Sequence, residues 1–173
     1  MPGMERQPGA LTLSEDDRRI LAPWAADCAE RALTLFEAQA PGDPRPREAI
    51  EGIRAFARGA LAVGPARALA ARSHAAAREV GDPAAVAAAR AAGHAVATAH
   101  MAAHARGAPG YAAKAAGLAT PDDPTAATDE IRWALGHASP AVREVLRRLP
   151  PPPRTGRLGE LISDLHAKVA AGD

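Results

Sequence analysis

The sequence is poor in cysteine, in aromatic residues and in long apolar runs. Its single cysteine, Cys28, cannot form an intrachain disulfide, which excludes a disulfide scaffold and favours a reducing, cytoplasmic compartment. Aromatic residues make up only 3% of the chain. No window reaches about eighteen uncharged apolar residues, and the N-terminus lacks the apolar core of a signal peptide. We therefore expect an unprocessed protein that does not cross a membrane.

Neither sign of charge dominates the sequence. It has 21 Lys and Arg against 20 Asp and Glu, a formal net charge of +1. A protein that binds nucleic acid or an anionic membrane surface usually carries a basic patch or stripe. The even balance predicts no nucleic-acid partner and no membrane partner.

Strand patterning is also missing, because no segment alternates polar and apolar residues over five positions with β-branched content. Alanine is abundant instead, at about a quarter of the residues, well above its ordinary share. With few large apolar side chains, the core must form between closely approaching helices. We predict an all-α fold, a multi-helix bundle of paired antiparallel helices, and leave a solenoid-like succession of pairs open.

Three Asp-Pro steps divide the middle of the chain, at residues 43–44, 82–83 and 123–124. Asp is a good N-cap and Pro suits the first helical position, so each step predicts a helix start. Further breaks are expected at Gly64-Pro65, at 107–110 and at Ser139-Pro140. The predicted helices are 15–39, 45–61, 65–80, 83–106, 110–119, 124–138 and 140–149.

These breaks predict four parts: a disordered N-terminal tail over 1–13, a helical domain over 14–149, a Pro-rich linker over 150–155 and a C-terminal amphipathic helix over 156–173. Four consecutive prolines in the linker favour an extended backbone. The last helix places apolar residues at helical spacing, and a helix so short is marginal alone in water. We expect it to dock on the body or to join two copies in a homodimer. Its apolar residues are Leu158, Leu161, Ile162, Leu165 and Val169.

The first two predicted helices carry stripes of opposite charge. Asp27, Glu30 and Glu37 share a face of the first helix, and Arg47 and Arg54 share a face of the second. These stripes are either partly buried ion pairs between the helices, for which Arg is well suited, or two solvated faces. The sequence alone leaves both interpretations open.

Three histidines lie in an alanine-rich segment, residues 93–107. An alanine helix gains no propensity from His, so these side chains serve packing, a partner or chemistry. His100 and His104 are four residues apart and are expected on one face of the 83–106 helix, with His94 about a third of a turn away.

A histidine pair at this spacing is half of a metal site, which Asp27 or Glu30 would complete across helices. The zincin pattern needs Glu directly after the first His, and Met101 stands there instead. We therefore expect these histidines to bind neighbouring polar groups within a small-residue interface, with no metal and no cofactor.

No segment carries a catalytic signature. No Gly-rich phosphate loop follows a strand, and a lone cysteine on an apolar helix face, such as Cys28, is usually inert. We expect no catalytic residues; an enzyme would use Asp27, Glu30, His94, His100 and His104. The predicted binding set is Asp27, Glu30, Glu37, Arg45, Arg47, Arg54, His94, His100 and His104.

Two segments carry a resemblance to a known family. They are WAADCAERALTLFEAQAPGDPRPREAIEGIRAFARG, at 24–59, and AAARAAGHAVATAHMAAHARGAPGYAAKA, at 87–115. They resemble bacterial all-helical immunity proteins of polymorphic-toxin systems, over about residues 13–133. The resemblance implies an intracellular protein that binds and neutralises a toxin effector, with no catalytic residues. The alternative is an enzyme or small-ligand-binding protein of secondary metabolism with a pocket lined by His and carboxylates.

Overall fold

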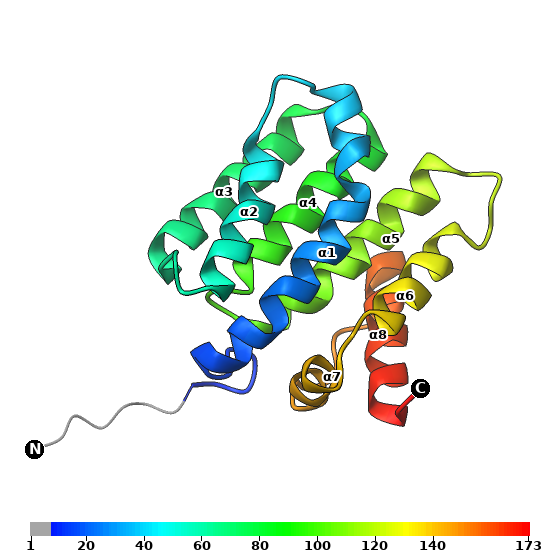
Figure 1. Ribbon diagram of the computed structural model, residues 1–173. Helices are drawn as coiled ribbons and strands as arrows, with labels where there is room; N and C mark the ends of the chain where they lie inside the picture. The colour runs from blue at the N-terminus through cyan, green and yellow to red at the C-terminus, as the bar shows by residue number, and fades with distance from the viewer. Residues whose placement is uncertain (1–7) are drawn as a thin grey trace, which may run out of the picture.

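The computed structural model describes residues 8–173, and the described part is all-helical with no strand (Figure 1). The predicted all-α bundle is confirmed. The predicted disorder of 1–7 falls outside the described residues. The elements are α1 (Glu15–Gln39), α2 (Arg45–Ala57), α3 (Val63–Glu79), α4 (Pro83–Ala97), the 3-10 helix η1 (Ala102–Arg106), α5 (Gly107–Ala119), α6 (Ala126–Gly136), α7 (Pro140–Arg147) and α8 (Gly156–Ala171).

Alanine makes α4 the centre of the bundle. This helix packs against α1, α2, α3 and α5, and the small side chains let the helices approach closely. Ala88, Ala89 and Ala92 are completely buried on it. Larger side chains from α1 and α2, such as Phe36, Ile53 and Phe56, fill the space beside them.

Helix starts follow the local signals in the sequence. Ser14 accepts a hydrogen bond from the Asp17 backbone N–H, and the Asp17 side chain accepts one from the Ser14 backbone, so a capping box begins α1. Asp82 caps α4 by accepting from Ala85 N–H, with Pro83 at the first helical position. The predicted starts near the Asp-Pro steps are confirmed to within a few residues.

The predicted helix over 83–106 is wrong, because α4 ends at Ala97. A turn and η1 follow, and α5 begins directly at Gly107, where a break was expected. The Ala99 carbonyl accepts a hydrogen bond at 2.9 Å from the buried Arg18 Nε, 81 positions away. Ala102 and Ala103 donate their N–H groups to the carbonyls of Thr12 and Leu11. These distant partners replace the hydrogen bonds of a continuous helix.

The same contacts order part of the predicted N-terminal tail. Because residues 11 and 12 bind the backbone of η1, the ordered body begins before residue 14. At the other end, residues 150–153 are non-helical, and α8 packs on α5, α6 and α7 (Figure 1). Leu161, Leu165 and Val169 are each 1% exposed, so the helix buries its apolar stripe on its own body.

Within residues 8–173, no helix is both long and apolar enough to cross a membrane.

Candidate functional site

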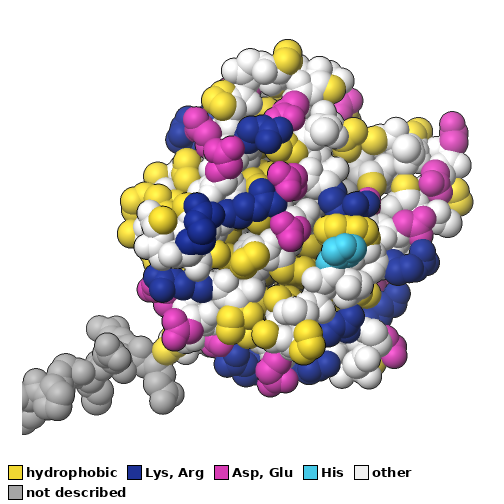
Figure 2. Space-filling view, in the orientation of Figure 1, with side chains coloured by type: hydrophobic (Ala, Val, Ile, Leu, Met, Phe, Trp, Pro, Cys, Tyr) yellow, Lys and Arg dark blue, Asp and Glu magenta, His cyan; other side chains and the backbone are white. Residues whose placement is uncertain are grey.

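The predicted charge stripes of α1 and α2 meet in ion pairs. Arg54 Nη2 lies 2.8 Å from Asp27 Oδ1 and 2.7 Å from Glu30 Oε2, and Arg47 Nη2 lies 2.6 Å from Glu37 Oε1. The Arg54 side chain is 30% exposed, while its two carboxylate partners are about half exposed. These ion pairs form a row that is partly open to solvent, which we call the charged row. It is intermediate between the buried ion pairs and the two solvated faces that the sequence left open. Figure 2 shows basic and acidic side chains mixed across this face.

Hydrogen bonds shift the pKa of Glu30 and that of Arg54 in this row. The Arg54 guanidinium lowers the pKa of Glu30 below its ordinary value, against the opposing effect of burial. Glu30 and, less strongly, Asp27 raise the pKa of Arg54. Glu30 and Arg54 are therefore charged at neutral pH, and their ion pair joins α1 to α2.

The row of charges continues to α6 through an aromatic group. Arg31 makes a two-pronged ion pair with Glu130, with both N–O distances 2.7 Å, and its guanidinium lies 4.2 Å from the centre of the Trp133 ring. His137 also stacks on this indole, with 3.8 Å between its ring centroid and that of Trp133. We call Trp133 of α6, His137 directly after this helix, and the α1 residue Arg31 that stacks on the indole, the α6 aromatic group.

A cleft of about 270 Å³ lies between this aromatic group and the charged row, lined also by Asp27 and Glu30. The two predicted carboxylates thus face a guanidinium, an indole and an imidazole at the surface. Arg and Trp are the residue types that most often dominate binding energy in protein interfaces. This arrangement suits the binding of a protein surface.

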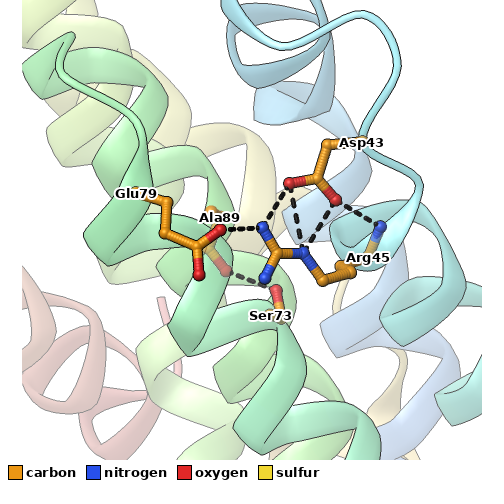
Figure 3. Close-up of polar contacts among 5 residues, drawn as sticks. All are labelled: Asp43, Arg45, Ser73, Glu79 and Ala89. Atoms are coloured by element: carbon orange, nitrogen blue, oxygen red, sulfur yellow. Dashed lines mark hydrogen bonds and ion pairs between the residues drawn. The ribbon is translucent and has the colours of Figure 1, made fainter.

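Arg45 lies apart from the charged row. Its Nη2 is 2.6 Å from Asp43 Oδ2 and 2.5 Å from Glu79 Oε2, so it ties the start of α2 to the end of α3 (Figure 3). The Asp43 side chain raises the pKa of Arg45, with a smaller contribution from Glu79. Nearby, the buried Ser73 hydroxyl donates to the Ala89 carbonyl at 2.8 Å and joins α3 to α4.

The histidines form a separate, partly buried cluster between α3, α4, η1 and α5. His94 lies 5.5 Å from His74 of α3, 5.2 Å from His104 of η1 and 5.0 Å from Tyr111 of α5, between ring centroids. His100 is 5.1 Å from His104. The four imidazoles therefore make a chain, His74–His94–His104–His100.

This arrangement corrects the prediction that His100 and His104 share one helical face. Because the chain leaves the helix after Ala97, His104 returns over His94, and their Nδ1 atoms are 3.3 Å apart. Two glycines make room for the rings: a Cβ on Gly93 would lie 2.6 Å from His74, and one on Gly107 2.4 Å from His94.

Burial keeps these histidines neutral. It lowers the pKa of His94 to about 3 and that of His100 to about 4, and it also lowers the pKa of His74 and His104. Like-charge repulsion among the imidazoles adds to the effect for His94. No group of three or more His, Cys, Asp or Glu side chains is placed to hold a metal ion within the described residues.

Cys28 is buried on α1, 1% exposed. Burial, with help from Asp27 and Glu130, raises the pKa of its thiol far above the ordinary value. A thiol held protonated is a poor nucleophile, which agrees with the inert role predicted for it.

The nine predicted binding residues therefore fall into three places. Asp27, Glu30 and Arg54 meet one another, with Glu37 and Arg47 further along the same row. Arg45 ties another pair of helices, and the three histidines lie in the histidine cluster. The cleft beside His94 and His104 has no carboxylate in its lining. The nine residues do not converge on one place, because Asp27, Glu30 and Glu37 pair with arginines.

Several residues of these sites were missed in the sequence. Trp133 and His137 are four residues apart, a helical spacing that signals a common face. His74 gave no local signal, since it joins the histidine cluster through a tertiary contact with His94.

A family model described as "Imm-5 like putative immunity protein" matches residues 11–141. The match covers α1 to α6, including the charged row, the aromatic group and the histidine cluster, and leaves α8 outside. No curated protein and no solved structure matches the chain. Because the matched residues are well over half of the 173, the chain belongs to the Imm-5 like putative immunity protein family.

Proposed function

We propose that this protein is an immunity-type binding protein that neutralises a toxin effector in the cytoplasm by protein–protein association. The observation that carries the proposal is the α6 aromatic group at the surface beside the charged row, both within the family-matched residues. Such a binding protein neutralises its partner by covering a surface that the partner needs.

The chemistry of this face favours a protein as the partner. Trp133 and Arg31 offer a flat aromatic and planar cationic surface, and Asp27 and Glu30 offer acceptors beside it. An aromatic and arginine centre surrounded by polar groups is the usual organisation of a specific protein interface. The mixed signs of charge favour a partner surface that is also mixed, and not a nucleic acid.

The proposal is tested with a candidate toxin domain taken from the genes that flank the one encoding this chain. Production of that domain alone should arrest growth of a bacterial host, and co-production of this chain should restore growth. Trp133→Ala and Arg31→Glu should each weaken the complex by about tenfold or more, since interface hot spots contribute about 2 kcal/mol or more.

Arg78→Glu is the matched control. Arg78 is an exposed arginine on α3, a helix that packs on α2 and α4, so this charge reversal should leave affinity unchanged. Failure of the native chain to bind the toxin domain or to restore growth would contradict the proposal. So would equal losses in the Arg78 and Arg31 variants.

A further inference from the structure

A second cleft, of about 230 Å³, lies on a different part of the molecule. It forms where the segment before α1, η1, the proline linker and α8 come together. Most of its lining side chains are apolar, and the polar residues of the lining are His94, His104 and Arg106. The apolar walls are Leu11, Met101, Pro152, Pro153 and Ile162.

Arg106 is the unusual residue of this cleft. It is only 4% exposed, and among the described residues it makes no ion pair with an Asp or Glu. Its Nη1 donates to the Pro150 carbonyl at 2.7 Å and lies 3.2 Å from His166 Nδ1, whereas Nε is buried without a hydrogen-bond partner. Burial lowers the pKa of its guanidinium, yet an arginine side chain stays charged at neutral pH.

A buried charge without a counter-charge is costly, and proteins usually pair it. The neighbouring groups of the cleft cannot supply the missing negative charge. His94 and His104 are neutral at pH 7, and the remaining lining side chains are apolar. An anion bound in the cleft close to the guanidinium would supply this negative charge.

The walls restrict what that anion can be. Leu11, Met101 and Ile162 favour an apolar body over a fully hydrated ion such as phosphate. An apolar cavity of about 150 Å³ accepts benzene, so this cleft has room for a ring-sized group and a carboxylate. A carboxylate oxygen is also a strong acceptor for a guanidinium N–H.

We propose that this cleft binds a small organic carboxylate, with the carboxylate on Arg106 and its apolar body between Met101, the linker prolines and Ile162. The proposal does not rest on the proposed function, since the cleft is separate from the α6 aromatic group. Two of its walls belong to the linker and α8, beyond the family-matched residues, so the ligand would be particular to chains with this C-terminal region.

Calorimetric titration of the full chain with acetate, hexanoate, benzoate and phenylacetate tests the proposal. Hexanoate, benzoate or phenylacetate should bind saturably, and acetate should bind at least about tenfold more weakly because it lacks the apolar body. Benzamide, which has the shape of benzoate without its charge, should also bind about tenfold more weakly, the loss expected for a hydrogen bond to a charged group. Inorganic phosphate should not compete.

Arg106→Gln should weaken carboxylate binding by at least about tenfold, whereas Arg132→Gln, which removes an exposed arginine of α6, should not. If the Arg106 variant does not fold, Ala103→Phe provides the second test, since it fills the cleft without changing the guanidinium. Absence of saturable binding by every carboxylate would overturn the proposal. Equal binding of benzamide and benzoate, competition by phosphate, or undiminished binding in the variant that folds would also overturn it.

Discussion

Arg54 and Arg18 illustrate two uses of arginine in this bundle. Arg54 lies between Asp27 and Glu30 at the surface, whereas Arg18, 9% exposed, donates to backbone carbonyls of Ala99 and Leu13. The first joins two helices through charge, and the second replaces hydrogen bonds that a helix end has lost. Because the surroundings of the two side chains differ, we expect their removal to lower the free energy of unfolding by different amounts.

Arg54→Ala should lower the free energy of unfolding by about 1 kcal/mol or less. Its two carboxylate partners remain about half exposed, so water replaces the lost pairing. Urea denaturation measures the change, with Arg132→Ala on the exposed side of α6 as a control expected near zero. A loss above about 2 kcal/mol would show that the carboxylates are buried in solution.

The partly buried histidines should make stability depend on pH. The pKa of His94 is about 3 in the folded chain and about 6.5 in an unfolded one, so the unfolded chain binds more protons between these values. Stability is therefore complete above pH 6.5 and falls as the pH drops towards 3. Between pH 7 and pH 5 we expect His94 alone to account for about 2 kcal/mol.

Urea denaturation at pH 7, 6 and 5 checks this prediction. His94→Gln should reduce the dependence of unfolding free energy on pH, whatever it does to stability at pH 7. His137→Gln, at the exposed residue that follows the last residue of α6, should leave the dependence unchanged. Equal stability of the native chain at pH 7 and pH 5 would show that the cluster is protonated or open to water.

At the scale of the helices, close approach decides where glycine is needed. Gly93 lets α4 meet His74 of α3, and Gly107 lets the start of α5 meet His94 of α4. Gly64, in the first turn of α3, serves no such contact, because a Cβ added there would have nothing within 4 Å. Glycine to alanine changes should therefore have opposite signs at these positions.

Gly107→Ala should destabilise the fold by about 1–3 kcal/mol, because the new Cβ would lie 2.4 Å from the His94 ring and 3.0 Å from its Cβ. Gly64→Ala should be neutral or stabilise by up to about 1 kcal/mol through helix propensity. Thermal and urea denaturation of the two variants measure both changes in stability. A Gly107 variant as stable as the native chain would mean that α4 and α5 separate freely.

At the scale of the whole molecule, one continuous core joins the N-terminal segment to α8. The Trp24 indole donates to the Ala134 carbonyl across 110 positions, and α8 packs on α5, α6 and α7. The C-terminal helix lies outside the family-matched residues, yet it shares this core. We expect the molecule to unfold as one cooperative unit.

Tryptophan fluorescence and helical circular dichroism should therefore give the same unfolding transition. Deletion of residues 154–173 should lower the melting temperature, because it uncovers the surface that buries Leu161, Leu165 and Val169. An unchanged melting temperature together with an unchanged mass in solution would contradict the packing of α8. A halved mass would instead indicate that α8 joins two copies.

The sequence by itself determined the features that depend on neighbours within about four residues. The alanine content predicted an all-helical bundle, the capping box and Asp82 marked the starts of α1 and α4, and helical spacing placed Asp27 and Glu30 on one face. These features are local because caps and helix faces are set by hydrogen bonds and geometry over a single turn.

Only the tertiary structure decided where α4 ends and what surrounds the histidines. The bond from Arg18 to the Ala99 carbonyl spans 81 positions, and residues 11 and 12 bind the backbone of η1. Helical periodicity continues through Ala97 in the sequence, so nothing local signals this break. The same turn brings His104 onto His94 and carries Arg106 to the linker, because backbone groups freed from a helix take whichever partners the packed chain provides.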